Sequence, residues 1–272
     1  MRCDLHVHSI ASGMFNVPGL DRICRESYTE PAEVYERLKR VSMSIVTLTD
    51  HDSIEGAETL RRHPDFFLSE EVTVRMPSGT EMHMGVYGIT ERKLFFSANH
   101  VFSGLTGRRE EEDFDWIESY IPAFETRNGQ MWPEANESAA RLAARLGKIA
   151  IAGSDSHTIA GVGHTFTEVP GARTAEEFFA GLRTGRGRIH GMHGSCGKLT
   201  ADVFSIVRSL FRDKPWTLAL SPLAVLVPTF TAGHWMNEIR FCQKWTATIE
   251  HGEKRKRMLW DLDSKFEANW AS

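Results

Sequence analysis

Runs of apolar, β-branched residues alternate with helix-forming segments along the first 195 or so residues. The expected strands cover 2–8, 44–49, 71–75, 81–88, 93–98, 121–125 and 149–152. The expected helices cover 29–40, 53–62, 113–120, 133–146 and 174–185, the first with Thr29 as N-cap. This alternation predicts an α/β fold in which helices cover a mainly parallel sheet, as a barrel or a doubly wound fold.

The pattern changes at about residue 196. Residues 196–272 form no strand–helix alternation and contain apolar segments broken by proline, which predicts a helical C-terminal appendage to a domain spanning 1–195. Within it, 216–233 has no charged residue but is interrupted by Pro222 and Pro228. Buried core or a docked helical hairpin is the favoured interpretation. Binding to a membrane surface or a partner is the alternative, because 244–256 is rich in Lys and Arg.

One connection is too short for the predicted parallel sheet. A helical crossover needs about a dozen residues, and the stretch from Tyr87 to Phe95 is shorter. Either the two flanking strands form an antiparallel pair, or a loop is missing from this chain.

Composition narrows the class of protein but does not name a function. The chain has 272 residues, a net charge of −4 and 41% hydrophobic residues, which are values of an ordinary soluble protein. The acidic balance disfavours a long nucleic acid as partner. The four cysteines have no C-x-x-C spacing and no secretory signal is visible, so a cytoplasmic location is expected. The 12 histidines are the unusual number.

Three histidine motifs each follow an expected strand. They are DLHVHS at 4–9, TDHD at 49–52 and GSDSH at 153–157. In α/β barrels the C-terminal ends of the strands form the active-site rim. Imidazoles and carboxylates gathered there are suitable ligands for Zn²⁺, Mn²⁺ or Fe²⁺. The motifs therefore predict a metal site.

In order and content, these motifs resemble those of the PHP (polymerase and histidinol phosphatase) family, over about residues 1–195. The resemblance implies a distorted (β/α)7 TIM-like barrel that binds two or three divalent metal ions (Mn, Zn or Fe). Stand-alone members of the family are mostly phosphoesterases. The implied metal ligands are His6, His8, His51, Glu71, His83, His100, Asp155 and His157. Glu70 is the alternative to Glu71 as the glutamate ligand. In the family a proline usually follows the histidine that matches His100, and here Val101 takes its place.

The chain also departs from the family pattern. Many members carry a metal-ligating Asp shortly after the first motif, and this chain has none near Gly13. One metal position is then expected to be weak, empty or completed by water. Asp50 and Asp52 flank His51 and are expected to orient imidazoles.

The resemblance implies hydrolysis of a small phosphomonoester or nucleotide by a metal-activated hydroxide. The residues assigned to catalysis are His8, Asp155 and His157, the last as a metal ligand or as the acid that protonates the leaving alkoxide. The candidate cations for the substrate phosphate are Arg22, Arg25, Arg108 and Arg109. Two alternatives stay open: a metal-dependent amide or ester hydrolase, and a non-catalytic metal-binding PHP module.

Overall fold

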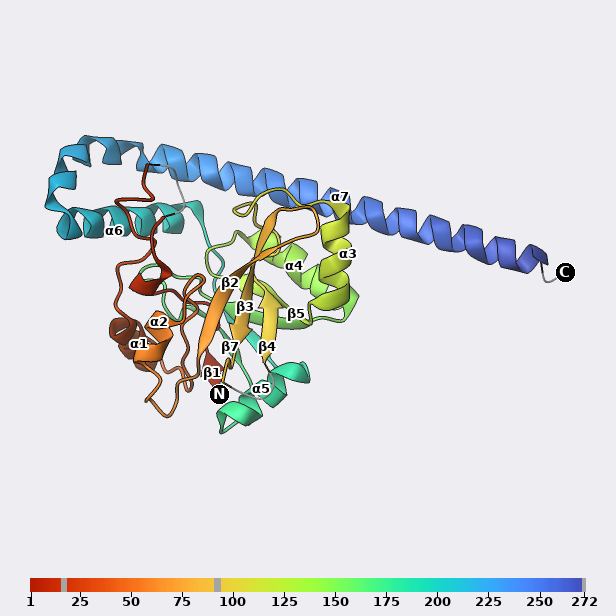
Figure 1. Cartoon of the computed structure of the whole chain (residues 1–272), viewed down its shortest axis with the longest axis horizontal. Helices are drawn as coiled ribbons and strands as arrows, with labels where there is room; N and C mark the ends of the chain where they lie inside the picture. The colour runs from red at the N-terminus through yellow and green to blue at the C-terminus, as the bar shows by residue number, and fades with distance from the viewer. Residues whose placement is uncertain (16–18, 91–93, 271–272) are drawn as a thin grey trace.

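The computed structural model describes residues 1–15, 19–90 and 94–270, with side chains described as far as residue 256 (Figure 1). Its strands are β1 (Arg2–Cys3), β2 (Ser69–Arg75), β3 (Glu81–Tyr87), β4 (Phe95–Ala98), β5 (Ala123–Asn128), β6 (Ile149–Gly153), β7 (Thr165–Glu168) and β8 (Arg188–Gly191). Its α-helices are α1 (Pro31–Arg40), α2 (Glu55–Thr59), α3 (Glu111–Tyr120), α4 (Pro133–Leu146), α5 (Ala175–Arg183), α6 (Cys196–Asp213) and α7 (Val227–Trp270). Two 3₁₀ segments are η1 (Ile10–Ser12) and η2 (Pro215–Leu226).

The fold is mixed α/β and its strands form two sheets. The larger has the order β2-β3-β4-β5-β6, and the smaller has the order β1-β7-β8. Pairing is parallel only from β4 to β6, whereas β2, β3 and β4 pair antiparallel, as do all strands of the smaller sheet. The expectation of a mainly parallel sheet was therefore wrong. The described strands do not close into a barrel, so the TIM-like barrel stays a prediction.

Two expected strands are largely replaced by extended segments. Of 2–8 only β1 is regular, and 44–49 contributes a single bridge from Val46 to Phe66. These segments still run side by side, since Thr49 N donates to Val7 O at 2.9 Å. Buried polar residues such as Thr47 and Thr49 use their side chains for backbone contacts here, which takes the place of a regular ladder.

The short connection after Tyr87 joins an antiparallel pair. Tyr87 faces Phe95 and Met84 faces Ala98 across β3 and β4, so no crossover is needed. This confirms the first of the two alternatives. Lys93, the expected start of the second strand, lies outside the described residues.

The helices begin and end largely where the sequence predicts. At α1 the N-cap is Glu30 rather than Thr29, because Glu30 and Glu33 form a reciprocal capping box ahead of Pro31. α4 ends at Gly147, whose φ of 63° is the left-handed cap that glycine adopts without strain. Apolar faces of these helices cover the sheets and close the core.

The C-terminal appendage is helical, as expected, although residues 271–272 lie outside the described part. α6 and α7 run side by side, joined by η2 at one end, and α7 continues past the body at the other (Figure 1). α7 docks through a stripe that includes Cys242, Trp245 and Ile249, which join the core beside Phe114. Residues 216–233 form the exposed bend of this helical hairpin, so the docked hairpin of the favoured interpretation is confirmed and the buried core was wrong.

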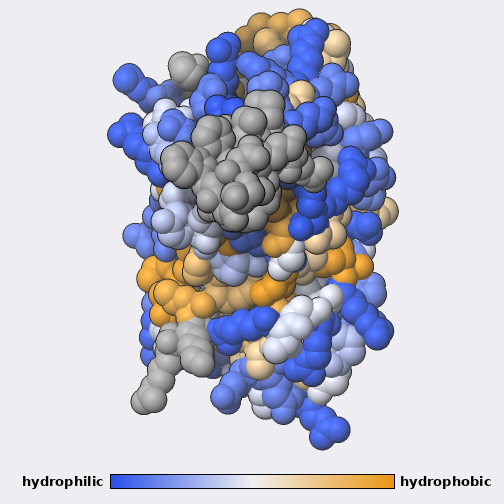
Figure 2. Space-filling view, turned by 90° about the vertical axis from the view of Figure 1, so that its right-hand side faces the viewer, coloured by the Kyte–Doolittle hydropathy of each residue, from blue (hydrophilic) through white to orange (hydrophobic). Residues whose placement is uncertain are grey.

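Figure 2 shows a face that is mostly hydrophilic, with hydrophobic residues gathered in a band across its middle. Hydrophilic residues thus cover most of the coloured part of this side, as expected for a surface in contact with water.

Candidate metal centre

The first and last motifs meet as neighbouring extended segments. Asp155 N donates to His6 O at 2.6 Å and His8 N donates to Ser156 O at 3.1 Å. Only glycine fits at position 153, because a Cβ there would overlap the His6 backbone and Cβ. This close approach places the two histidines of the first motif beside the carboxylate of the last.

Glu71 lies at the centre of the imidazoles. Its side chain is fully buried, and its carboxylate oxygens lie 3.1–3.7 Å from nitrogens of five histidines: His6, His8, His51, His83 and His100. Period two along β2 turns Glu70 to the other face, where it is only partly buried. The structure therefore places Glu71, and not Glu70, in the cluster.

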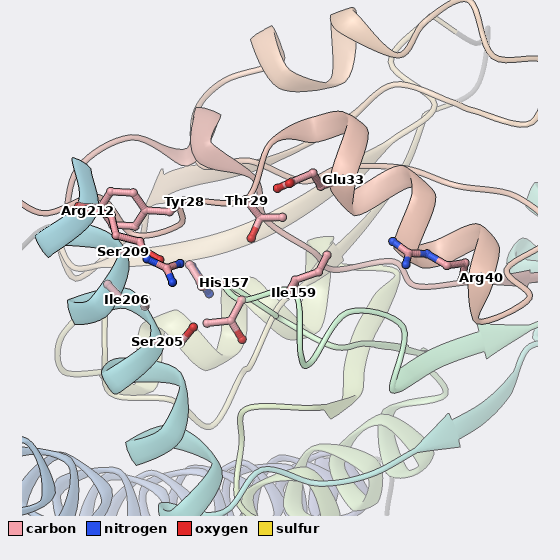
Figure 3. Close-up of a pocket in the computed structure, with 11 residues that line it drawn as sticks. Tyr28, Thr29, Glu33, Arg40, His157, Ile159, Ser205, Ile206, Ser209 and Arg212 are labelled. Carbon is pink, nitrogen blue, oxygen red and sulfur yellow. The ribbon is translucent and has the colours of Figure 1, made fainter.

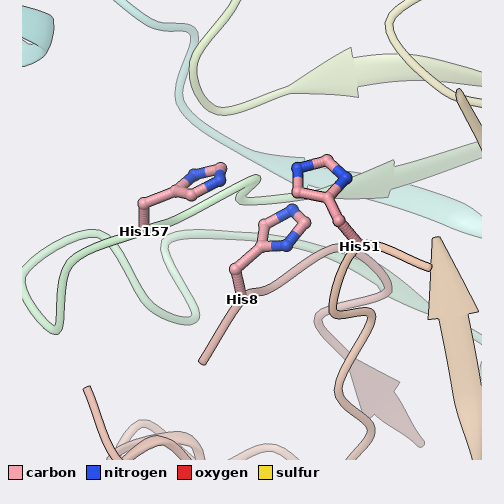
Figure 4. Close-up of side chains that lie close together, drawn as sticks. All are labelled: His8, His51 and His157. Carbon is pink, nitrogen blue, oxygen red and sulfur yellow. The ribbon is translucent and has the colours of Figure 1, made fainter. Parts of the chain in front are cut away.

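Eight side chains form four overlapping groups whose ligand atoms lie within 4.8 Å of one another. The groups are His8–His51–His157, His6–His8–Glu71, His6–His100–Asp155 and His51–Glu71–His83. Figure 4 shows the first group, in which the rings of His8 and His157 stack with centroids 4.2 Å apart. Every metal ligand implied by the sequence resemblance is present in at least one group.

Several atoms of this cluster are buried with no hydrogen-bond partner among the described residues. They are His6 Nε2, His8 Nε2, Glu71 Oε2, His83 Nδ1 and His100 Nδ1. An unsatisfied buried polar atom is costly, and five in one place fit a cation that would accept their lone pairs. The donor set of imidazole nitrogen and carboxylate oxygen suits Zn²⁺, Mn²⁺ or Fe²⁺.

Hydrogen bonds behind the rings fix their tautomers. His8 Nδ1 lies 3.0 Å from Ser12 Oγ, which itself donates to Asp50 Oδ1 at 2.8 Å. The hydroxyl must therefore accept from His8 Nδ1–H, which leaves a lone pair on Nε2. His6 Nδ1 likewise donates to Glu125 Oε1 at 2.9 Å, leaving its Nε2 for a metal.

Three imidazoles of the cluster are held neutral by burial. It lowers the pKa of His8 to about 3, with a smaller contribution from His157. It also lowers the pKa of His83, and that of His51 well below its ordinary value. A neutral imidazole is the form that binds a metal ion.

His6 behaves differently. Burial alone would lower its pKa, but the carboxylates of Asp155, Glu71 and Glu125 raise it well above the ordinary value. Burial would raise the pKa of Glu71 and Asp155, yet the neighbouring imidazoles, His6 first, hold both well below the usual range. A proton on His6 therefore occupies the place that a divalent cation would take among these carboxylates.

Two cluster residues have left-handed backbone conformations. φ is 28° at His100 and 50° at Asp155, a region that non-glycine residues adopt rarely. Such strain is tolerated where surrounding contacts fix the backbone, as it often is at functional sites. Here His100 N donates to Glu125 Oε2 at 2.9 Å, and Asp155 N is held by His6.

The sequence analysis missed four residues that contact the cluster. Glu125 supports His6, Asn99 donates to Glu71 Oε1 at 2.8 Å, and Asn128 donates to both Glu125 and Asp155 at 2.9 Å. Glu26 Oε2 lies 3.3 Å from His51 Nε2. Glu125 and Asn128 could have been suspected from their place at the end of an expected strand, but no motif marks Glu26.

Of the two acidic residues beside His51, only one supports an imidazole. Asp50 acts on His8 through Ser12, as described above. Asp52 instead accepts from Thr73 N and Oγ1, both at 2.7 Å, and so joins the loop to β2. The expectation that Asp52 orients an imidazole finds no contact in the described structure.

A pocket of about 370 Å³ lies beside the cluster (Figure 3). His157 belongs both to the pocket wall and to the cluster. The wall next to His157 comes from α6, through Ser205, Ser209 and Arg212, and α1 contributes Glu33 and Arg40 on the other side. The appendage therefore builds part of the cavity next to the metal ligands.

None of the four candidate phosphate-binding arginines lines this pocket. Arg22 and Arg108 are exposed and Arg25 is half-buried. Arg109 is buried, where it donates to Glu81 O at 2.6 Å, and burial lowers its pKa to about 10. The phosphate role of these arginines stays a prediction.

The remaining histidines lie outside the cluster. His63 stacks on Tyr35, His164 contacts Arg37, His190 pairs with Glu168, His193 contacts Asn136, and His234 and His251 lie on α7. His164 does not line the pocket.

A family model described as PHP-associated matches residues 133–186. The chain carries a PHP-associated segment. This segment runs from α4 through α5 and contains Asp155 and His157, so the resemblance of the last motif to the PHP family is confirmed. No curated protein matches the chain.

One solved structure extends the likeness in fold beyond that segment. A two-domain protein from Bacteroides vulgatus, which contains a predicted PHP-like metal-dependent phosphoesterase, matches with 18% identity and a TM-score of 0.51, over 75% of this chain and 69% of that chain. PsfC from Pseudomonas syringae matches with 16% identity and a TM-score of 0.49, over 77% and 97%. An amidohydrolase from Chromobacterium violaceum with bound sulfate matches with 15% identity and a TM-score of 0.46, over 69% and 97%. The first of these shows that the fold is PHP-like.

Proposed function

We propose that this protein is a metal-dependent phosphoesterase acting on a small phosphomonoester or nucleotide. The observation that carries the proposal is the set of buried, unpartnered imidazole and carboxylate atoms around Glu71. The ions would be held by His6, His8, His51, Glu71, His83, His100, Asp155 and His157. Two or three divalent ions in such a cluster bind phosphoryl oxygens and lower the pKa of bound water toward neutrality.

The chain's own residues orient these ligands and handle a proton. His157 Nδ1 lies 3.2 Å from Asp155 O, and a carbonyl only accepts, so Nδ1 carries the proton in this arrangement. Its Nε2 is then the atom available to an ion or to the leaving-group oxygen. Because His157 also lines the pocket, it is suited to act as the acid in its doubly protonated form, in which Nε2 carries the proton that passes to the departing alkoxide.

The pocket supports a small, polar substrate. Its volume of about 370 Å³ is that of a small-molecule site, and its hydroxyls and two arginines suit a phosphorylated, hydroxyl-bearing compound. Arg212 of α6 is the cation we assign to the substrate phosphate or to a second anionic group. Arg212→Gln is expected to raise KM about tenfold with little change in kcat. Arg208→Gln, one turn earlier on the same helix and outside the pocket, is the control.

The function is tested by metal analysis of the purified protein together with phosphate release from a panel of phosphomonoesters in Mn²⁺. We expect bound metal, turnover, and a loss of roughly 100-fold or more in His8→Ala, with His63→Ala unchanged. Tight metal binding without turnover of any phosphate ester would leave the non-catalytic module as the better account. Turnover of amides or carboxylic esters alone would favour the metal-dependent amide or ester hydrolase.

A further inference from the structure

The bend between α6 and α7 is the most apolar exposed part of the described surface. No charged residue occurs between Lys214 and Glu238, and we call residues 215–237 the apolar tip. Its exposed large side chains are Trp216, Leu218, Leu220, Leu223, Val225, Leu226, Phe230 and Met236. Phe230 is 71% exposed and Val225 is 76% exposed, so the body of the protein does not cover them. A contiguous apolar patch of this kind marks a binding surface.

The apolar side chains point in all directions around the segment. In a 3₁₀ helix, with three residues per turn, Trp216, Leu218 and Leu220 of η2 fall on three different sides. A protein partner buries one face of a helix and leaves a polar face for water. A helix that is apolar all round is instead suited to an environment that surrounds it, such as the acyl region of a bilayer.

Charges flank the apolar tip on both sides along the chain. Arg208 and Lys214 precede it, with Asp213 between them, and Arg240 and Lys244 follow it after Glu238; Arg212 lines the pocket and is not counted. The net charge of these flanks is positive, which complements anionic lipid headgroups. Trp216 and Trp235 lie near the two ends of the tip, the residue type enriched at membrane–water interfaces.

The docking of α7 limits how deeply the apolar tip could enter a lipid bilayer. One helical stretch, Pro215–Lys256, is long and apolar enough to cross a membrane by length and composition. From Thr231 onward, however, this stretch is held against the rest of the protein, by the bond between Thr231 and Thr200 Oγ1 at 2.7 Å and by buried Glu238, which accepts from Gly104 N. The free part is too short to span about 30 Å of hydrocarbon.

We propose that the apolar tip inserts into the surface of an anionic lipid bilayer and anchors the protein there without crossing it. Insertion buries the exposed aromatic and aliphatic side chains in the boundary between headgroups and acyl chains. The basic flanks then contact the headgroups. The proposal does not depend on catalysis, because neither the tip nor its flanks belong to the metal cluster.

Co-sedimentation of the full-length protein with vesicles tests this anchor. One set of vesicles is phosphatidylcholine and the other is phosphatidylcholine with phosphatidylglycerol. We expect binding to both, stronger to the anionic vesicles and weakened by salt. The variant carrying Trp216→Ser, Leu223→Ser, Val225→Ser and Phe230→Ser is expected to bind at least about tenfold more weakly.

A matched variant, Leu105→Ser with Tyr120→Ser, removes two side chains that are 61% and 66% exposed away from the tip, and is expected to bind as the unchanged protein does. Circular dichroism and metal content show whether the tip variant keeps its fold. Absence of co-sedimentation with either vesicle would overturn the proposal. So would a dimer in solution, seen by light scattering, that the tip substitutions dissociate, because the tip would then bind a second copy of the chain.

Discussion

His6 Nδ1 lies 2.9 Å from Glu125 Oε1, and each side chain is only 1% exposed. The same carboxylate accepts from His100 N and Asn128 Nδ2 through its other oxygen. Both oxygens of Glu125 therefore only accept hydrogen bonds. They fix the orientation of the His6 ring and the position of the His100 backbone. Removing such support behind a metal ligand costs about 10–100-fold in metal affinity.

We therefore expect Glu125→Gln to weaken metal binding by about 10–100-fold. The NH2 group of the glutamine would face a group that also donates, so one of the hydrogen bonds from His6, His100 or Asn128 would be lost. Titration of the metal-free protein with Zn²⁺ or Mn²⁺, followed by calorimetry, measures the change. Glu118→Gln, at an exposed position of α3, is the matched control. Unchanged affinity in Glu125→Gln would mean that Glu125 does not act on the metal centre.

Adjacent residues of β2 offer a sharper comparison. Glu71→Gln should abolish binding of at least one ion, because two of the four ligand groups contain this carboxylate. Glu70→Gln, on the other face of the strand, should leave metal content unchanged. Elemental analysis of the two purified proteins decides between them, and equal metal loss in both would contradict the assignment of Glu71.

Glu26 brings a carboxylate to the imidazoles of His8, His51 and His157, which form a group without one of their own. We expect it to serve where the family pattern has an Asp near Gly13. Glu26→Gln should then lower the affinity of one ion by about tenfold and leave the others bound. A titration that resolves the ions checks this, and the outcome against it is an identical isotherm. Asp21→Asn, in the same loop, is the control.

Gly153→Ala should destabilise the protein by about 2 kcal/mol or more, since the new Cβ would press on the His6 backbone. Gly147→Ala is the comparison, because its Cβ would meet nothing within 4 Å and only the left-handed φ opposes it; about 1 kcal/mol is expected there. Urea unfolding of both variants measures the free energies. A smaller effect at 153 than at 147 would show that the first and last motifs are not tightly packed.

The environment of Asp65 predicts how the free energy of unfolding changes at acidic pH. Partial burial opposes ionisation, but hydrogen bonds from Lys39 and Tyr35 dominate and lower the pKa of Asp65. A lowered folded-state pKa contributes stability that is present above the unfolded value near 3.9 and is lost as pH falls through the folded value. Asp65→Asn should therefore cost about 1 kcal/mol at pH 7 and progressively less below about pH 4. Unfolding curves across that range measure this, and a constant difference would contradict it.

The sequence was most informative where local chemistry determines structure. His51, His100 and His157 lie in the cluster because each follows an extended segment that ends at one rim, whereas Glu71 and His83 lie within β2 and β3. Helices with proline starts and a glycine end, such as α4, have their predicted bounds. In both cases the signal lies within a few residues of the feature.

Long-range pairing explains what the sequence did not predict. The antiparallel partner of β1 is β7, far along the chain, and the apolar run at 44–49 has the same composition whether it forms a regular strand or a single bridge. Glu26 and Glu125 reach the histidines from loops and strands far along the chain. Arg212 reaches the pocket only because α6 packs on the loop around Cys24.

α6 has a position with consequences for both of its ends. Its middle and last turns supply one wall of the pocket, and η2 starts two residues after it ends. The joint between them is a single residue, Lys214, braced by its bond to Ile23 O at 2.9 Å and by Thr217 Oγ1 donating to its carbonyl at 2.6 Å. This joint links the bend to the helix that carries Arg212. If binding at the bend alters the affinity of the pocket for its ligand, then by thermodynamic reciprocity a molecule bound in the pocket alters the affinity of the bend by the same factor.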